Sequence, residues 1–198
     1  MKEAGVPGWE EKLESVSKSL LEQIDTLSQT ATEFSSFARF FSEEITRVDL
    51  DELSAELKEF FDNREDVQIE YCREGAGEAA VDARRSQLGR VFVNLITNAI
   101  QAIDSTGQAG GRVRISLSPA QEGKAWQIDV EDNGPGVSEE DLSKLFKPNF
   151  TTKKTGTGLG LAICRSIIEQ SQGTIAYNRS DLGGARFTIV LPAAYSRA

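Results

Sequence analysis

The chain has 198 residues, of which 39% are hydrophobic, and a formal net charge of −9. This length suits one well-packed domain with an appendage and is short for two full domains. Lys and Arg are scattered without a long basic run. Together with the negative net charge, this argues against a surface that binds nucleic acid.

Residues 1–9 are expected to form a segment without regular structure, and no part of the chain has the pattern of a membrane anchor. No apolar run approaches the length of a transmembrane helix, and residues 1–4 lack the apolar core of a signal peptide. Cys72 and Cys164 have no companion Cys or His at metal-ligand spacing, which favours two reduced core thiols. We therefore expect a cytoplasmic chain without membrane contact.

A heptad pattern without Pro or Gly predicts one long helix over residues 10–41. One position of the repeat is held by Leu13, Leu20, Leu27, Phe34 and Phe41, and the alternate position by Ile24, Ala31 and Ala38. Such a narrow stripe favours packing in a bundle or coiled coil over a helix that lies on its own domain. We expect homodimers to form through this helix.

Residues 42–47 are polar and predict a linker, and residues 48–198 predict one further domain. Asp49 with Glu52 is typical of a capped helix start, and the helix should run to about residue 61. Alternating apolar residues then predict a strand over 67–71, and we expect residues 79–81 to supply its short partner strand.

The next predicted helix begins near Gln87, ends before Gly107 and carries two amides, Asn94 and Asn98, four positions apart. Its apolar face consists of Leu88, Val91, Leu95 and Ile96. Residues four apart lie on the same side of a helix, so the two amides should be neighbours. Amides on a helix that leans toward the core need polar partners, and a hydrated Mg²⁺ with its phosphates is one such partner.

A carboxylate stands at the end of the next antiparallel pair of predicted strands, residues 113–117 and 126–130. Asp132 follows the second strand and precedes a glycine turn through Gly134 and Gly136. This order places the carboxylate at the floor of a pocket, where it can accept from an exocyclic amine such as that of adenine.

A polar segment, residues 147–153, lies between this turn and a second glycine box, and a short helix capped by Ser138 should precede it. The second box contains Gly156, Gly158 and Gly160. Alternating glycines let backbone N–H groups face phosphate oxygens, and the helix that follows adds the positive end of its dipole. Lys153 and Lys154 are the cations best placed to meet phosphate. The stretch predicts a nucleotide site with a lid.

Two last strands, residues 174–177 and 185–191, complete the predicted sheet. The fold class is α+β: a two-layer α/β sandwich with a mixed, mostly antiparallel sheet and about three covering helices, preceded by one long helix.

Taken in order, these four elements resemble the N box, first glycine box, F box and second glycine box of the sensor histidine kinase ATP-binding domain. That domain shares the Bergerat, or GHKL-type, fold with gyrase-type, heat-shock-chaperone-type and mismatch-repair ATPases. One glycine box alone would indicate only a tight turn, but the ordered set covers about residues 48–192. The sequence departs from the family pattern at Arg84, Asn149 and Gln172.

The resemblance implies ATP and Mg²⁺ as cofactors. It implies that Asp132 binds the adenine amine, that Asn98 coordinates Mg²⁺, and that Asn94 is the catalytic position beside the triphosphate. Lys153 would meet the phosphates. The remaining nucleotide-binding positions are Gly134, Gly136, Thr157, Gly158, Leu159 and Gly160.

Residues 22–39 resemble the second helix of the dimerisation and histidine-phosphotransfer hairpin in nitrogen-regulation-type sensor kinases. The first hairpin helix, which carries the phosphoacceptor, would then be missing, and the chain contains no histidine. The resemblance implies transfer of the γ-phosphoryl of ATP to a histidine outside this chain and then to a response regulator aspartate. The implied partners are ATP or ADP, the phosphoacceptor helix and a receiver domain. The expected cytoplasmic location includes the case in which the chain is the cytoplasmic part of a membrane-bound sensor.

Two alternatives stay open. One is a serine kinase of the anti-sigma type on the same fold, which the heptad helix disfavours, and the other is a nucleotide-sensing module without chemistry. Asn94 stands where hydrolysing clamps of this superfamily have a glutamate that activates water. An amide is no general base at neutral pH, so slow hydrolysis and transfer to a positioned nucleophile are expected.

Overall fold

The computed structural model describes residues 16–17, 44–62, 66–107, 109–153 and 156–194. The predicted helix over residues 10–41 lies outside these ranges except for Val16 and Ser17, which are helical. Within the described ranges, no helix combines the length and apolar character needed to span a membrane.

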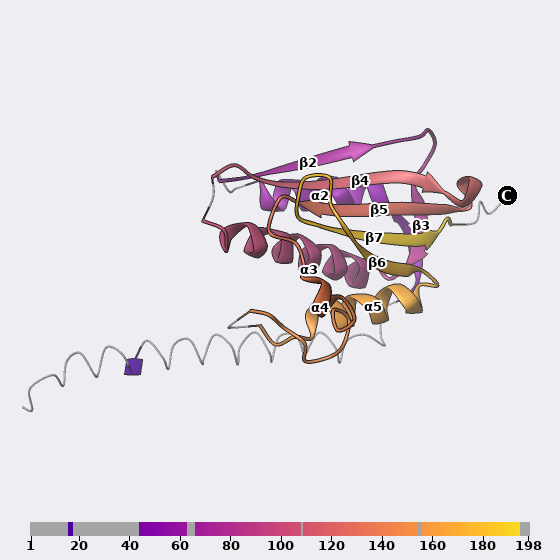
Figure 1. The fold of residues 1–198 in the computed structure, drawn as a ribbon. Helices are drawn as coiled ribbons and strands as arrows, with labels where there is room; N and C mark the ends of the chain where they lie inside the picture. Colours follow the sequence, from indigo (N-terminus) through magenta and orange to yellow (C-terminus); the bar gives the residue numbers. More distant parts are fainter. Residues whose placement is uncertain (1–15, 18–43, 63–65, 108, 154–155, 195–198) are drawn as a thin grey trace, which may run out of the picture. The chain divides into compact units, whose positions relative to one another are not determined.

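A five-stranded mixed sheet forms one layer of the domain that begins at residue 44 (Figure 1). Its order is β2-β4-β5-β7-β6, with β2 and β4 parallel and every other neighbouring pair antiparallel. The strands are β2 (Val67–Arg73), β4 (Gly111–Ala120), β5 (Ala125–Asp132), β6 (Thr174–Arg179) and β7 (Ala185–Pro192). This arrangement confirms the predicted mixed, mostly antiparallel sheet.

Only one face of the sheet is apolar, because successive side chains of a strand point to opposite faces. Fully buried side chains on that face include Val113, Ile115, Leu117, Ile128, Val130 and Ile189. The opposite face carries polar pairs such as Thr188, which donates to Asp129. The alternation therefore requires a covering layer on one side.

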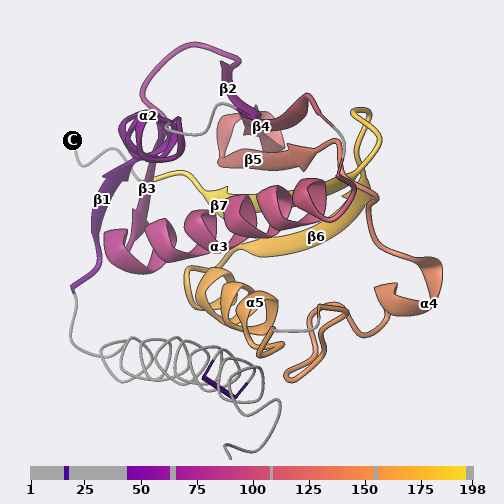
Figure 2. The same ribbon diagram turned by 90° about the vertical axis from the view of Figure 1, so that its left-hand side faces the viewer.

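Three helices supply that layer: α2 (Leu50–Phe61), α3 (Arg85–Asp104) and α5 (Gly160–Gln170). The long helix α3 lies beside α5 against the sheet (Figure 2). The predicted apolar face of α3 is confirmed, since Leu88, Val91, Leu95 and Ile96 are all buried. The capped start of α2 is also confirmed, because Asp49 Oδ1 accepts from the backbone N–H of Asp51 at 2.8 Å.

The prediction for the partner of the 67–71 strand is wrong. Strand β3 (Ala80–Ala83) pairs antiparallel with β1 (Thr46–Asp49), while β2 pairs with β4. Strand β1 also begins inside the predicted linker, residues 42–47. Four-residue strands contain too few side chains for a period of two to be recognised.

Two short helices lie in connections. The helix η2 (Gln121–Gly123) turns β4 into β5, and α4 (Glu139–Leu142) is the predicted short lid helix. The predicted cap of α4 differs in detail, because the Ser138 hydroxyl hydrogen-bonds Asp141 Oδ2 at 2.7 Å and caps no backbone N–H. The hydroxyl is instead oriented to donate to the Asp141 carboxylate three positions along the chain.

Gln172 follows α5 with a φ of 58°, in the left-handed region that costs a non-glycine residue about 1–2 kcal/mol. Glycine removes that cost, but its greater conformational entropy stabilises the unfolded state by about 0.4–1 kcal/mol. We expect Gln172→Gly to raise the free energy of unfolding by up to about 1 kcal/mol, measured by urea denaturation. Gln170→Gly, at the end of α5, is the control and should lower it by about 1 kcal/mol. Equal losses in both variants would contradict the strain assigned to Gln172.

Candidate nucleotide site

Asp132 is the last residue of β5 and is buried, with only 3% of its surface exposed. Its Oδ1 accepts from the backbone N–H groups of Gly134 at 2.8 Å and Ala185 at 3.1 Å. Both bonds go to Oδ1, so within the described residues Oδ2 keeps its acceptor capacity. Burial raises the pKa of this carboxyl, and the two backbone donors oppose that rise because they stabilise the charged form. The carboxylate is oriented and can receive a neutral N–H donor.

Two glycines allow the chain to pack closely around Asp132. A Cβ on Gly184 would lie 2.0 Å from Asp132 Oδ1 and 2.6 Å from the backbone nitrogen of Gly134. A Cβ on Gly134 would lie 3.1 Å from the Ala102 Cβ on α3. The glycine pair directly before β7, Gly183 and Gly184, is a visible signal in the sequence. Gly184 is therefore a site residue that the sequence analysis missed.

The predicted neighbouring amides of α3 are confirmed. Asn98 Nδ2 donates to Asn94 Oδ1 at 2.9 Å, which turns Asn98 Oδ1 outward. That oxygen accepts from the Lys153 ammonium at 2.6 Å, and Gln101 Oε1 accepts from the same ammonium at 2.6 Å. Desolvation by the surrounding protein lowers the pKa of Lys153. A lid cation and both amides of the N box thus form one polar cluster.

The second glycine box packs against this cluster. Gly160 begins α5, and a Cβ there would lie 2.5 Å from Asn94 Nδ2. Leu159 is the N-cap of α5 and provides no side-chain cap, and Thr157 is half-buried beside it. The first N–H groups of a helix have no partner within the helix, so the start of α5 is suited to an anion.

Gly158 also makes room for the lid backbone, a role that the sequence did not indicate. Its φ is 68°, and a Cβ would lie 2.6–2.8 Å from the lid backbone at Asn149 and Phe150. Glycine is required there by close approach of the lid as well as by conformation. Gly136, after Asp132, has a φ of 74° and likewise needs glycine.

The base of the lid is anchored on the sheet by aromatic contacts. The ring of Phe146 packs edge-to-face on Phe187 of β7, with centroids 6.4 Å apart. The hydroxyl of Tyr177 on β6 accepts from the backbone N–H of Val137 at 3.1 Å. Asn149, where the sequence departs from the family pattern, has a φ of 63°, a conformation that asparagine tolerates well. These anchors position the segment that bears Lys153.

The boxes recognised in the sequence therefore converge on one side of α3. Residues 83–195 match the family described as histidine kinase-, DNA gyrase B- and HSP90-like ATPases. The chain belongs to this family.

Similar proteins place this ATPase domain among sensor histidine kinases. The chain is 33% identical over 181 residues to the sensor histidine kinase ZraS of Escherichia coli K12, which is 90% of this chain and 37% of ZraS. It resembles the catalytic domain of the histidine kinase ThkA at a TM-score of 0.66 and 31% identity, covering 75% of this chain and 95% of that one. It also resembles ThkA in complex with the response regulator protein TrrA, at a TM-score of 0.66 and 26% identity over 98% of this chain and 54% of that one. The resemblance stated from the motifs is confirmed, and the chain spans well under half of ZraS.

The donor set of this ATPase domain fits Mg²⁺ that arrives with phosphates. In the described ranges, no group of three or more His, Cys, Asp or Glu side chains could hold a metal ion. Mg²⁺ typically keeps several waters and takes one or two protein oxygens together with substrate phosphates. Asn98 Oδ1 already faces a cation, the Lys153 ammonium, so its orientation suits that single protein ligand.

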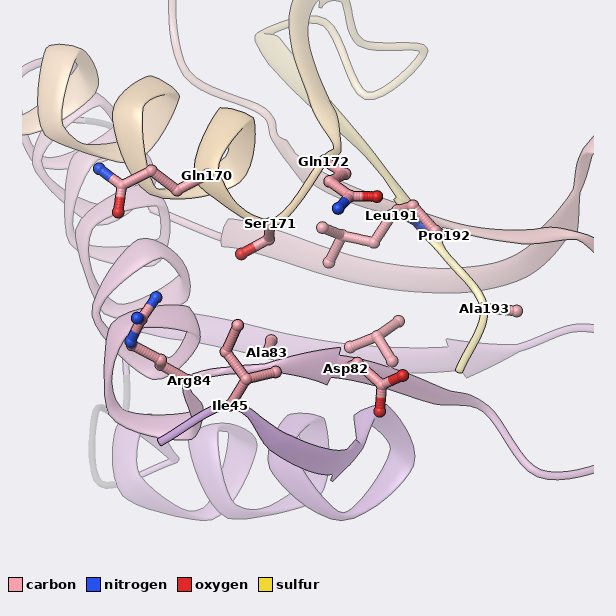
Figure 3. Close-up of a pocket in the computed structure, with 11 residues that line it drawn as sticks. Ile45, Asp82, Ala83, Arg84, Gln170, Ser171, Gln172, Leu191, Pro192 and Ala193 are labelled. Atoms are coloured by element: carbon pink, nitrogen blue, oxygen red, sulfur yellow. The ribbon is translucent and has the colours of Figure 1, made fainter. Parts of the chain in front are cut away.

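A groove of about 200 Å³ lies elsewhere on the ATPase domain (Figure 3). It is lined by Ile45 just before β1, by residues of β3 such as Asp82, by the end of β7, and by the end of α5 with the residues that follow it, such as Gln172. The glycine box lies at the other end of α5, and a helix of 11 residues is about 16 Å long. The groove contains none of the predicted site residues and is separate from the nucleotide site.

Proposed function

We propose that this chain is the ATP-binding catalytic part of a two-component sensor histidine kinase. The observation that carries the proposal is the meeting of Asn94, Asn98, Lys153 and the uncapped start of α5 on one side of α3. We further propose the division made from the sequence: residues 1–9 as a loose start, 10–41 as the second hairpin helix, and 48–198 as the ATP-binding domain.

Asp132 would bind the adenine of ATP. Its Oδ2 can accept from the exocyclic amine, while the backbone N–H groups of Gly134 and Ala185 hold Oδ1 in place. A base without an amine at that position would bring a carbonyl oxygen against a carboxylate oxygen. This repulsion supports selection of adenine over guanine.

The phosphates would lie between the start of α5 and α3. Backbone N–H groups near Gly158 and Gly160 would face their oxygens, and Lys153 would add a positive charge. Asn98 would hold Mg²⁺, which when bound neutralises the charge of the β- and γ-phosphates. Because these donors are in place before reaction, they stabilise the charge that develops during transfer.

The reaction proposed for this site is in-line phosphoryl transfer. A nitrogen of the acceptor histidine attacks the γ-phosphorus while the bond from that phosphorus to the β–γ bridging oxygen breaks, and ADP leaves. Asn94 cannot remove a proton from water, so water is a poor competitor of the histidine. Since the chain has no histidine, the acceptor belongs outside it.

We propose a response regulator receiver domain as the final acceptor and a homodimer through the helix at 10–41. The similar ThkA structure is a complex with a response regulator, which supports the kind of partner. The relatives include sensor histidine kinases, and this disfavours the alternative of an anti-sigma-type serine kinase. Residues 42–47 would then join the hairpin helix to the catalytic domain.

Radiolabelled ATP tests the proposed function. The chain alone should hydrolyse ATP slowly and acquire no acid-labile label, whereas an added hairpin fragment that carries a histidine should become labelled in an acid-labile way. The control is an Asn98→Ala chain, which should transfer little label because it lacks the proposed Mg²⁺ ligand. Acid-stable label on the chain alone would indicate serine or threonine chemistry, and fast hydrolysis without an acceptor would indicate a clamp ATPase.

A further inference from the structure

Gln101 is an unassigned residue that contacts the proposed phosphate-binding lysine. It lies on α3 three positions after Asn98, so the two side chains are neighbours on the helix surface. Its Oε1 accepts from Lys153 Nζ at 2.6 Å, the same distance at which Asn98 Oδ1 accepts from that atom. The ammonium is therefore shared between two amide oxygens of one helix, although it lies more than 50 positions away in the sequence.

The two acceptors are not equivalent if Asn98 is the Mg²⁺ ligand. An ammonium and a divalent cation on the same oxygen would lie close together and repel one another. Binding of Mg·ATP would then require Lys153 to leave Asn98. Gln101 is far enough along α3 to keep its bond to the ammonium, and its neutral amide neither cancels the lysine charge nor repels phosphate.

We propose that Gln101 is a positioning residue for Lys153. It retains the lid ammonium over α3 when Asn98 binds Mg²⁺, and so directs the lysine toward the phosphates. This role rests on the proposed function. The observed contact of the Gln101 amide oxygen is with Lys153 Nζ, so the residue would act through that lysine.

A double-mutant cycle separates this role from an ordinary surface contact. The variants are Gln101→Met, which keeps side-chain length without an acceptor, Lys153→Met, and both together. Calorimetry with Mg·ATP should show about a three- to tenfold loss of affinity in Q101M, in the range of coupled neighbouring residues. In the K153M background, Q101M should change the affinity by less than about twofold.

Hydrogen exchange of the nucleotide-free protein gives a second readout. Exchange of backbone amides in residues 147–153 should be faster in Q101M than in the wild type, because the Lys153 ammonium loses one of its two hydrogen bonds to α3. Gln170→Met, a matched exposed glutamine at the end of α5, should alter neither exchange nor affinity. Equal losses of Mg·ATP affinity from Q101M with and without Lys153 would overturn the role, as would unchanged affinity and exchange. Failure of the wild type to bind Mg·ATP would instead overturn the proposed function, and the exchange result would still test the Gln101–Lys153 contact.

Discussion

Replacing Asp132 by asparagine is expected to lower the affinity for ADP by about 1–3 kcal/mol, the effect of leaving a buried hydrogen-bonding group without its partner. The fold should survive, because the asparagine Oδ1 can still accept from the N–H groups of Gly134 and Ala185. That bonding turns the new NH₂ group to the position of Oδ2, where it faces the adenine amine donor to donor. Isothermal titration calorimetry with ADP measures the loss.

The matched control is Asp129→Asn on the same strand. Asp129 points to the opposite face of the sheet, where it accepts from Gln127 and Thr188 and lies away from the site. This variant should bind ADP as the wild type does. Unchanged ADP affinity in Asp132→Asn would remove Asp132 from adenine recognition.

Alanine at Gly184 is expected to impair both folding and nucleotide binding. The new methyl would overlap Asp132 Oδ1 and approach the backbone nitrogen of Gly134, and neither neighbour is the free end of a flexible side chain. Overpacking of this kind costs about 1–3 kcal/mol of unfolding free energy. Urea denaturation should show that loss, and calorimetry at a temperature where the variant is folded should show weaker ADP binding.

Gly89→Ala makes the same chemical change at an open site. Gly89 lies within α3, and among the residues that the structure describes a Cβ there would meet only the Leu53 Cδ1, at 3.9 Å. Alanine is a better helix former than glycine by about 1 kcal/mol, so this variant should gain stability. If both glycine variants changed stability in the same direction, the close approach at Gly184 would not be the cause.

Local spacing was enough to predict much of the site. Asn94 and Asn98 are four positions apart on a helix, and a helix brings such residues together whatever packs around it. Asp132 is the last residue of β5, so its carboxylate lies at the end of that strand. The family resemblance relied on the order of these local signals, and the match to the ATPase family confirmed it.

The partners of these residues could not be predicted from spacing. Ala185, which donates to Asp132, is 53 positions away, and Lys153 is 55 positions from Asn98. Such contacts depend on which strand lies beside which and on where the lid folds back. No periodicity in the sequence encodes either.

By itself, the sequence determined most elements of the α+β sandwich, β1 excepted, and the residue types at the site, because helix and strand periods are local properties of the chain. Only the tertiary structure decided that β3 pairs with β1 and that Gly184 borders Asp132. It also decided that Gln101 shares the lysine with Asn98. Each of these depends on how the layers pack, where side chains far apart in the chain compete for the same space and the same hydrogen-bonding groups.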